Sequence, residues 1–252
     1  MNHINLKNSY IMKFLTINFF ATVLILASCK KNPPTNPVSS NCLLQSYVTS
    51  DNSISNKINY DANNQVISVE SVGSNYTSIV PIKDARNRIY KIDYYNGTTL
   101  TTETIYQFDA SNRITLISYY QQGTLIGYAS WTYSSGSRPT EQKLYNISNG
   151  NTTLTETDDY TYDSRGNLLT DGNETYTYDD KPNAIQALSF FPVALAGNAN
   201  NITSDITKDN SGDITASEIS TYTYDSNGNV IQRKEIDNIG VSTIYNYSFL
   251  CH

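Results

Sequence analysis

Apolar and polar residues alternate in short stretches along most of the chain from residue 42 onward. Large aromatic side chains stand two positions apart in Tyr160-Thr161-Tyr162 and again in Tyr222-Thr223-Tyr224. A spacing of two is typical of a β-strand that buries one face. The chain has 21 tyrosines in 252 residues and many Thr, Asn and Ser residues, a composition that favours a pleated, half-buried surface. The pattern therefore predicts an all-β protein.

A turn phrase follows many of these stretches. It reads Y-T-Y-D-S-R-G-N-L at Tyr160–Leu168 and Y-T-Y-D-S-N-G-N-V at Tyr222–Val230. An aspartate side chain accepts a hydrogen bond from the backbone two residues on, so it initiates a turn. We therefore interpret the phrase as a hairpin repeat, whose copies align at Asp61, Asp84, Asp109, Ser134, Asp163, Asp179, Asp209 and Asp225.

The third residue after the aspartate supports the hairpin interpretation. It is glycine or asparagine in most copies, including Gly166, Gly212 and Gly228, and these residue types tolerate the positive φ of a hairpin loop. Pro182 occupies this position in the Asp179 copy, and proline cannot reach positive φ, so that turn must have a different shape.

A second set of turns lies between the aspartate turns, for example at Asn96-Gly97 and Asn149-Gly150. The two sets together predict an antiparallel meander of about 14 to 16 strands, curled or barrel-like, with aspartate turns at one rim and glycine turns at the other. An apolar run at residues 184–197 interrupts the pattern and is predicted to be a short irregular or helical insert.

The N-terminal segment has the parts of an export signal. Met12-Lys13 is followed by an uncharged run, Phe14 to Ser28, which is shorter than the stretch of about 20 residues that spans a membrane. Its Leu-Ala-Ser-Cys ending resembles the bacterial lipobox, which implies lipid attachment at Cys29 and removal of residues 1–28. The true start is Met1 or Met12, and a secreted soluble protein is the alternative.

The predicted domain organisation follows from this signal. Residues 29–41 contain three prolines and form a flexible tether after the lipidated cysteine, and residues 42–252 form a single β domain. Removal of residues 1–28 takes away Lys7 and Lys13, which leaves 15 basic and 23 acidic residues and a formal charge of −8. The basic residues are scattered, so nucleic acid is not an expected partner.

The repeat phrase resembles the YD repeat of the rearrangement-hotspot (RHS) proteins over most of residues 56–234. The chain lacks the Asp-Pro dipeptide at which RHS toxins cleave themselves. It is more closely similar to short Bacteroidota lipoproteins of unknown function that are described as porin-like. The shared features are Cys42-Leu43-Leu44, the phrase Tyr178–Asn183, the Asn-Asn-Ile-Thr at 200–203, and a terminal cysteine.

This resemblance implies a fold and a compartment, with no catalytic residue or cofactor to transfer. The expected location is the bacterial outer membrane, through the lipid anchor. Lys30-Lys31 directly after the lipid cysteine leaves both the periplasmic and the cell-surface face open.

Cys42 and Cys251 stand at the two ends of the β domain. Cysteines of exported proteins commonly form disulfides, so a bond between them is predicted, with two free thiols as the alternative. The bond requires the first and last strands to meet, which favours a closed ring over an open solenoid.

Reaction chemistry is scarce in this sequence. His252 is the one histidine after residue 28, and no metal, phosphate-loop or nucleophile motif is present, so no cofactor is expected. Carboxylates that glycan hydrolysis would need are available at Asp158-Asp159, Glu174 and Asp179-Asp180. Aspartates that recur in register with the fold are better explained as turn formers.

The aromatic residues are candidates for stacking against sugar rings or for filling the core. The candidate stacking residues are Trp131, Tyr94, Tyr95, Tyr119 and Tyr120. The predicted function is that of a lipid-anchored, noncatalytic cell-envelope protein with a structural or interaction role, and an envelope protein or a glycan as partner. The alternatives are a carbohydrate-binding surface lipoprotein and a carboxylate-dependent glycan hydrolase.

Overall fold

The computed structural model describes residues 42–183, 198–209 and 211–251. These residues form sixteen β-strands, and no helix occurs among them. In chain order the strands are β1 (Cys42–Thr49), β2 (Ser55–Tyr60), β3 (Val66–Val72), β4 (Ser78–Lys83), β5 (Ile89–Asn96), β6 (Thr99–Phe108), β7 (Ile114–Gln121), β8 (Thr124–Thr132), β9 (Glu141–Ser148), β10 (Asn151–Tyr162), β11 (Leu168–Asp171), β12 (Glu174–Pro182), β13 (Asn200–Lys208), β14 (Ile214–Tyr224), β15 (Val230–Asp237) and β16 (Ser242–Cys251).

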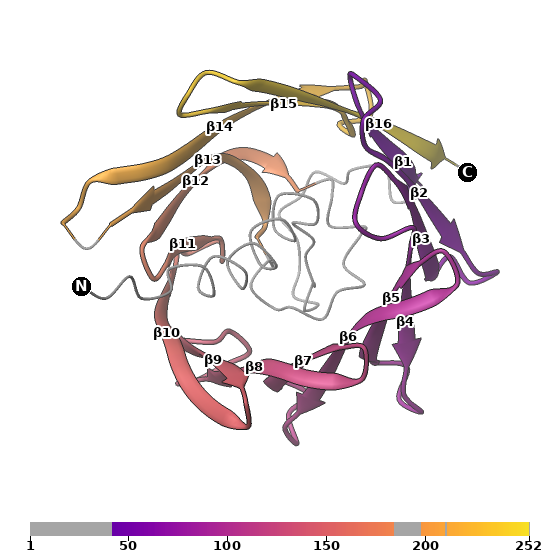
Figure 1. The fold of residues 1–252 in the computed structure, drawn as a ribbon. Helices are drawn as coiled ribbons and strands as arrows, with labels where there is room; N and C mark the ends of the chain where they lie inside the picture. The colour runs from indigo at the N-terminus through magenta and orange to yellow at the C-terminus, as the bar shows by residue number, and fades with distance from the viewer. Residues whose placement is uncertain (1–41, 184–197, 210, 252) are drawn as a thin grey trace, which may run out of the picture.

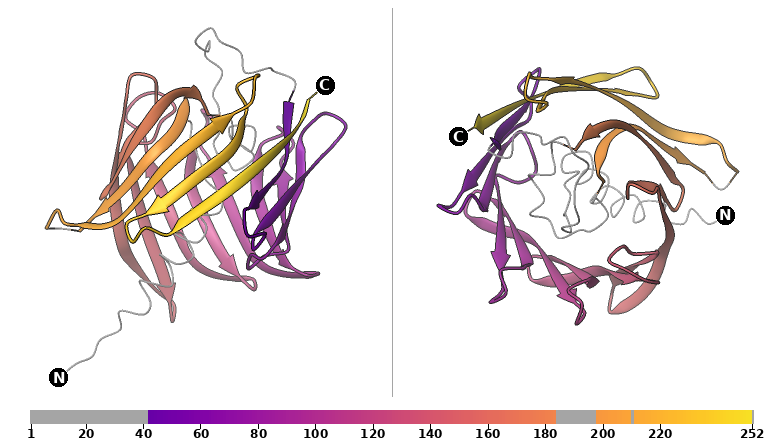
Figure 2. Two further views of the ribbon diagram at one scale, coloured as in Figure 1. Left: turned by 90° about the horizontal axis from the view of Figure 1, so that it is seen from above. Right: turned by 180° about the vertical axis from the view of Figure 1, so that it is seen from behind.

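The strands close into one barrel. Each strand pairs antiparallel with its neighbours in sequence, and β16 pairs with β1, so that the sheet forms a ring (Figure 1). The strands are tilted against the barrel axis, as closure of a sheet requires (Figure 2). The predicted all-β antiparallel, barrel-like fold is confirmed, and the number of strands lies within the predicted interval. The predicted insert at 184–197 lies outside the described residues.

The seam between β1 and β16 joins the two ends of the domain. Its register runs from Cys42 opposite Cys251 to Thr49 opposite Tyr245, with one shift between Leu44 and Ser46. An even number of strands makes the first and last strands antiparallel, so their ends meet at the same rim. The backbone therefore places the predicted disulfide partners opposite each other, and the bond itself stays a prediction.

Alternate turns lie at opposite ends of the barrel. We call the end that holds Cys42 the aspartate rim, because the turns that begin at Asp61, Asp84, Asp109, Ser134, Asp163 and Asp225 lie there. The expectation that every aspartate turn shares this rim is wrong for Asp209. Strand β12 already ends at the aspartate rim and β13 leads away from it, so the Asp209 turn lies at the opposite rim.

The core lines the inner wall. Residues directly opposite each other on adjacent strands share a face, and the buried members of one face join a single cluster that includes Leu44, Tyr94, Trp131 and Tyr160. This face is the inside of the barrel, because it unites strands from distant parts of the ring. From β2 to β9 it is largely aliphatic, with Ile58, Val69, Ile79, Ile92, Ile117, Ala129 and Leu144.

Candidate functional site

The repeat aspartates bind the backbone of their own turns. In the Asp109 turn one carboxylate oxygen accepts the N–H groups of Ser111 (2.8 Å) and Arg113 (2.9 Å), and the other accepts Arg113 Nε (2.7 Å). The backbone hydrogen bond from Arg113 is the largest cause that lowers the pKa of Asp109. The third residue after the aspartate has positive φ in six turns, at Asn64, Asn87, Asn112, Gly166, Gly212 and Gly228. These carboxylates therefore stabilise the turns.

Arginines link neighbouring turns along the aspartate rim. Arg88 follows its turn aspartate by four residues, donates to Asn112 Oδ1 of the next turn (2.8 Å) and lies 4.4 Å from the ring centroid of Phe108. Arg113 repeats the arrangement, with Gly136 O at 3.0 Å and the Tyr133 ring at 4.6 Å. These links between turns were not predicted from sequence. An arginine four residues after the turn-initiating residue in three consecutive copies could have indicated them.

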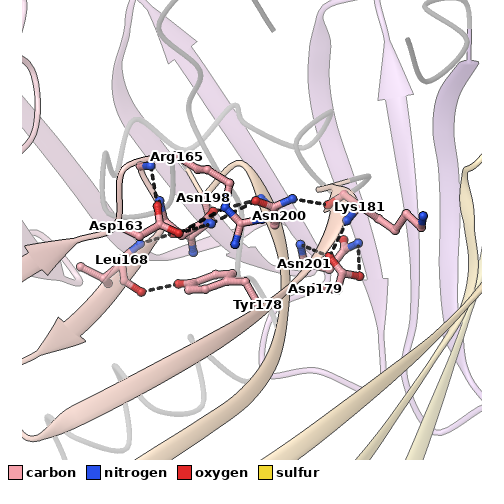
Figure 3. Close-up of polar contacts among 11 residues, drawn as sticks. Asp163, Arg165, Leu168, Tyr178, Asp179, Lys181, Asn198, Asn200 and Asn201 are labelled. Carbon is pink, nitrogen blue, oxygen red and sulfur yellow. Dashed lines mark hydrogen bonds and ion pairs between the residues drawn. The ribbon is translucent and has the colours of Figure 1, made fainter. Parts of the chain in front are cut away.

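Buried amides replace the arginines farther along the rim. Asn167, which is fully buried, donates through Nδ2 to Asp163 Oδ2 (2.9 Å) and to Asn200 Oδ1 (3.0 Å), and its Oδ1 accepts the Asn200 N–H (3.1 Å). The Leu168 N–H donates to Asn198 Oδ1 (2.8 Å). These contacts connect the start of β11 with the start of β13, past the end of β12. Figure 3 shows Asp163, Leu168, Asn198 and Asn200 of this network.

Asp179 differs from the other aligned aspartates because it lies within β12 and not at a hairpin turn. Its carboxylate accepts the N–H of Lys181 (3.0 Å) and Nδ2 of Asn201 (3.1 Å) (Figure 3). It also accepts the hydroxyl of Tyr224 (2.6 Å). The sequence predicted that the Asp179 copy, with Pro182 three residues on, differs in shape from the other turns, and the strand at Asp179 agrees with this. Asp179 thus fastens β12 to β13 and β14 at the rim.

The candidate stacking residues do not form one platform. Tyr94 and Trp131 are buried in the inner cluster, and Tyr119 packs against it. Tyr95 and Tyr120 directly follow inward-facing residues, so they point to the outer face. Adjacent residues of a strand face opposite sides of the sheet, so the pairs Tyr94-Tyr95 and Tyr119-Tyr120 are divided between the two faces. Binding of a ligand to any of them stays a prediction.

A row of tyrosines lies on the outer face of β5–β9. We call this set the outer tyrosine row; its members are Tyr95, Tyr120, Tyr128 and Tyr145. Tyr128 and Tyr145 are opposite each other and stack, with centroids 4.6 Å apart and planes 19° from parallel. Both rings are partly exposed. The ion pairs of Lys91 with Asp93 and with Glu103, each at 3.0 Å, lie beside the row.

Carboxylates gather on the inner face of β10–β15. We call this set the acid row, and the strand register assigns its members to the same face as the buried Tyr160 and the partly buried Tyr176. Asp171 is opposite Glu174 across a two-residue turn, and Asp205 is opposite Glu218. Its members are Glu156, Asp158, Asp171, Glu174, Asp205, Glu218 and Glu235.

Burial and mutual repulsion raise the pKa of several groups in the acid row. Desolvation raises the pKa of Asp205 to about 7, with Glu174 and Glu218 adding to the shift and Arg233 opposing it. Desolvation and then Glu174 and Asp158 hold the pKa of Asp171 well above its ordinary value. These carboxyl groups can therefore hold protons near neutral pH.

The turn between Asp171 and Glu174 depends on its glycine. Gly172 has a φ of +54°, and a Cβ there would lie 2.2 Å from Asp158 Oδ1. Any side chain at this position would displace Asp158 from the acid row. Within the described ranges no group of three or more His, Cys, Asp or Glu side chains is arranged to hold a metal ion.

The carboxylates considered for glycan hydrolysis are divided by the fold. Asp158 and Glu174 belong to the acid row, whereas Asp159 alternates with Asp158 and faces outward, and Asp180 is exposed. Asp171, Asp205 and Glu235 were not predicted as site residues, because no local sequence pattern sets them apart from other acidic residues.

The outer face of the barrel is polar. Hydroxyl groups pair across adjacent strands, as in Thr161 with Thr170 (2.7 Å), and ion pairs such as Lys143 with Glu141 (2.9 Å) lie between them. Exposed apolar side chains, among them Ile219 and Ile236, lie between these polar positions on the strands. No helix in the described part of the chain is long and apolar enough to cross a bilayer.

Comparisons with known proteins give likeness of fold. Neither a protein-family model nor a curated protein matches the sequence. A porin-like protein from Bacteroides uniformis is similar with 14% identity over 87% of this chain and 100% of that chain, at a TM-score of 0.41. A porin-like protein from Bacteroides vulgatus is similar with 13% identity over 82% and 98%, at a TM-score of 0.43. A TcdB2-TccC3-Cdc42 structure has 14% identity over 77% of this chain and 9% of that chain, at a TM-score of 0.31.

Proposed function

We propose that this chain is a lipid-anchored, noncatalytic protein of the bacterial cell envelope, whose barrel has a structural or interaction role. The polar outer face is the observation that supports this most strongly. A barrel that spans a membrane presents a continuous apolar band to the lipid, whereas this outer wall carries hydroxyl pairs and ion pairs. Such a barrel stays in water, so its attachment depends on the lipid of Cys29 rather than on its strands.

The noncatalytic part of the proposal rests on the turns. The repeat aspartates are engaged with the backbone of their own loops, which gives them a structural task. The same turns are consistent with a YD-repeat protein of the RHS-like type. Under this proposal a disulfide between Cys42 and Cys251 latches the seam, and the protein resides at the outer membrane on its periplasmic or cell-surface side.

The anchor is tested by detergent phase partition of cells that produce the full-length chain. The wild-type protein is expected in the detergent phase and Cys29→Ser in the aqueous phase, because loss of the lipid removes the main apolar surface. Cys42→Ser is the matched control and should partition like the wild type. A Cys29→Ser protein that resists extraction from membranes by alkaline carbonate would show that the barrel itself inserts, and would overturn the proposal.

Carbohydrate binding is the second candidate, and the outer tyrosine row favours it. The stacked pair Tyr128 and Tyr145 presents partly exposed ring faces, and sugar rings stack on such faces while nearby carboxylates accept hydrogen bonds from their hydroxyl groups. Asp93 and Glu103 lie on the same outer face.

Calorimetric titration with a panel of envelope polysaccharides tests this second candidate. Saturable binding that is lost in Tyr128→Ala and Tyr145→Ala, and kept in the inward-facing control Tyr119→Phe, would support it. An absence of binding across the panel would leave the structural or protein-interaction role.

A further inference from the structure

The acid row places like charges directly opposite each other on adjacent strands. Asp171 is opposite Glu174, and Asp205 is opposite Glu218. Carboxylates in this relation destabilise a sheet when both are ionised. Most inward positions of this wall could have held an apolar residue, as they do from β2 to β9. The repulsion between these paired carboxylates therefore needs an explanation.

Positive charge on the inner wall of β10–β15 is confined to one end. Among the described residues, Arg233 is the basic side chain on this wall. It forms ion pairs with Glu218 (2.9 Å) and with Glu235. Asp205 is opposite Glu218 and is influenced by Arg233, whereas Asp171 lies two strands farther from it. The repulsion is therefore greatest toward β11 and β12.

The pairing of β11 with β12 is short, and that of β12 with β13 is irregular. Strand β11 has four residues, and its register with β12 comprises two pairs, Thr170 with Thr175 and Asp171 with Glu174. The register of β12 with β13 shifts twice, around Tyr178. The β11–β12 junction therefore has few backbone hydrogen bonds with which to resist a separating force.

We propose that the acid row is a pH-operated switch, which keeps β11–β14 closed while its carboxyl groups hold protons and loosens these strands when the groups ionise. The acid row is built for titration near neutral pH, because the folded barrel raises the pKa of Asp205 to about 7 and raises that of Asp171 as well. Burial also raises the pKa of Glu235, against the opposing effect of Arg233.

The titratable groups that face these carboxyls allow this behaviour. Asp171 is faced from β10 by Glu156, Asp158, Tyr160 and Tyr162, and from β12 by Glu174 and Tyr176. Asp205 is faced from β12 by Glu174, Tyr176 and Tyr178, from β14 by Glu218, and from β15 by Arg233. Glu235 is faced by Arg233, Glu218, Tyr222, Tyr245 and Tyr247. Burial raises the pKa of these tyrosines, so they stay uncharged while the carboxyls titrate.

The direction of the pH effect follows from proton linkage. A carboxyl group whose pKa is higher in the folded state binds more protons folded than unfolded, so stability falls as pH rises between the two pKa values. For Asp205 this interval runs from the ordinary 3.8 to about 7. The closed barrel should therefore weaken from mildly acidic to mildly alkaline pH.

The first test measures the urea midpoint of the purified protein at about pH 5 and about pH 8. The wild-type midpoint is expected to be lower at the higher pH. Asp171→Asn and Asp205→Asn mimic the protonated side chains and should reduce this difference. Asp159→Asn is the matched control, because it removes an outward carboxylate from the same part of the sheet, and it should keep the wild-type difference.

The second test locates the opening and needs only the wild-type protein. Amide hydrogen exchange, corrected for the intrinsic effect of pH, should quicken in β11–β14 by about tenfold per unit of pKa difference, and should stay unchanged in β5–β8. A wild-type midpoint that is equal or higher at the alkaline pH would overturn the proposal. So would Asn variants that behave like the Asp159 control, or an exchange increase spread evenly around the ring.

Discussion

Asn167 provides a direct test of the hydrogen-bond network at the aspartate rim. Asn167→Ala removes the donor to Asp163 Oδ2 (2.9 Å), the donor to Asn200 Oδ1 (3.0 Å) and the acceptor of the Asn200 N–H (3.1 Å). A hydrogen bond contributes about 1 kcal/mol net, and a buried group left without a partner costs about 1–3 kcal/mol. Asn167 is 0% exposed, so water cannot replace the lost contacts without rearrangement. We expect a loss of about 3–5 kcal/mol in the free energy of unfolding.

Equilibrium urea unfolding followed by tryptophan fluorescence measures this loss. Trp131 is the single tryptophan of the chain and is 6% exposed, so its emission should report loss of the core. The substitution should lower the midpoint and leave the slope against urea unchanged, because the surface exposed on unfolding stays the same. Asn227→Ala is the matched control in another turn of the same rim, where the side chain is exposed, and it should change stability by less than about 0.5 kcal/mol.

A second substitution at the same position separates the hydrogen bonds from the loss of volume. Asn167→Asp keeps the shape but places a carboxylate beside that of Asp163, so it should destabilise more at about pH 7 than at about pH 4. If Asn167→Ala unfolds within about 1 kcal/mol of the wild type, the amide network does not hold β11 to β13, and the reasoning fails.

Three further outcomes follow from the turns and the seam. Hydrogen bonds lower the pKa of Asp84 and Asp109 in the folded state. The stability that these two carboxylates contribute is therefore present above the ordinary pKa of 3.8 and is lost as the pH falls through the folded-state pKa. Urea midpoints measured over a series of acidic pH values would show this loss. Arg113→Lys should cost about 1 kcal/mol in urea unfolding, because lysine cannot bridge two turns while it stacks on the neighbouring ring; an unchanged midpoint would contradict this. Cys42→Ser should lower the thermal midpoint as much as reduction of the wild type does. Chain entropy predicts a loss of about 4–5 kcal/mol for a loop of about 200 residues. A wild-type midpoint that does not change with reductant would argue against the bond to Cys251.

Local features of the fold were readable from sequence because the interactions behind them span only a few residues. The Asp109 carboxylate binds backbone groups two and four positions away, so the aspartate and its following asparagine or glycine suffice to predict a turn. The period of two in Tyr222-Thr223-Tyr224 likewise predicted a strand with one buried face. The rim of the Asp209 turn was missed, because it depends on how many strands precede it.

The closed ring determines which side of the sheet is the inside and which distant residues become neighbours there. Tyr94 and Tyr95 are adjacent in sequence, yet one packs in the core and the other joins the outer tyrosine row. Asp171, Asp205 and Glu235 are separated by more than 25 residues from one to the next, and no local pattern marks them. Only the pairing of β11 through β15 places them on one wall, where burial and mutual repulsion raise their pKa values.

The sequence by itself determined the strands, the aspartate turns and the antiparallel order of this protein, because each arises from contacts between near neighbours. The tertiary structure alone decided the closure of β1 onto β16, the arginine and amide links between turns, and the acid row. These features join residues that are distant in the chain, and their energies arise only when the ring has closed and excluded water from its inner wall.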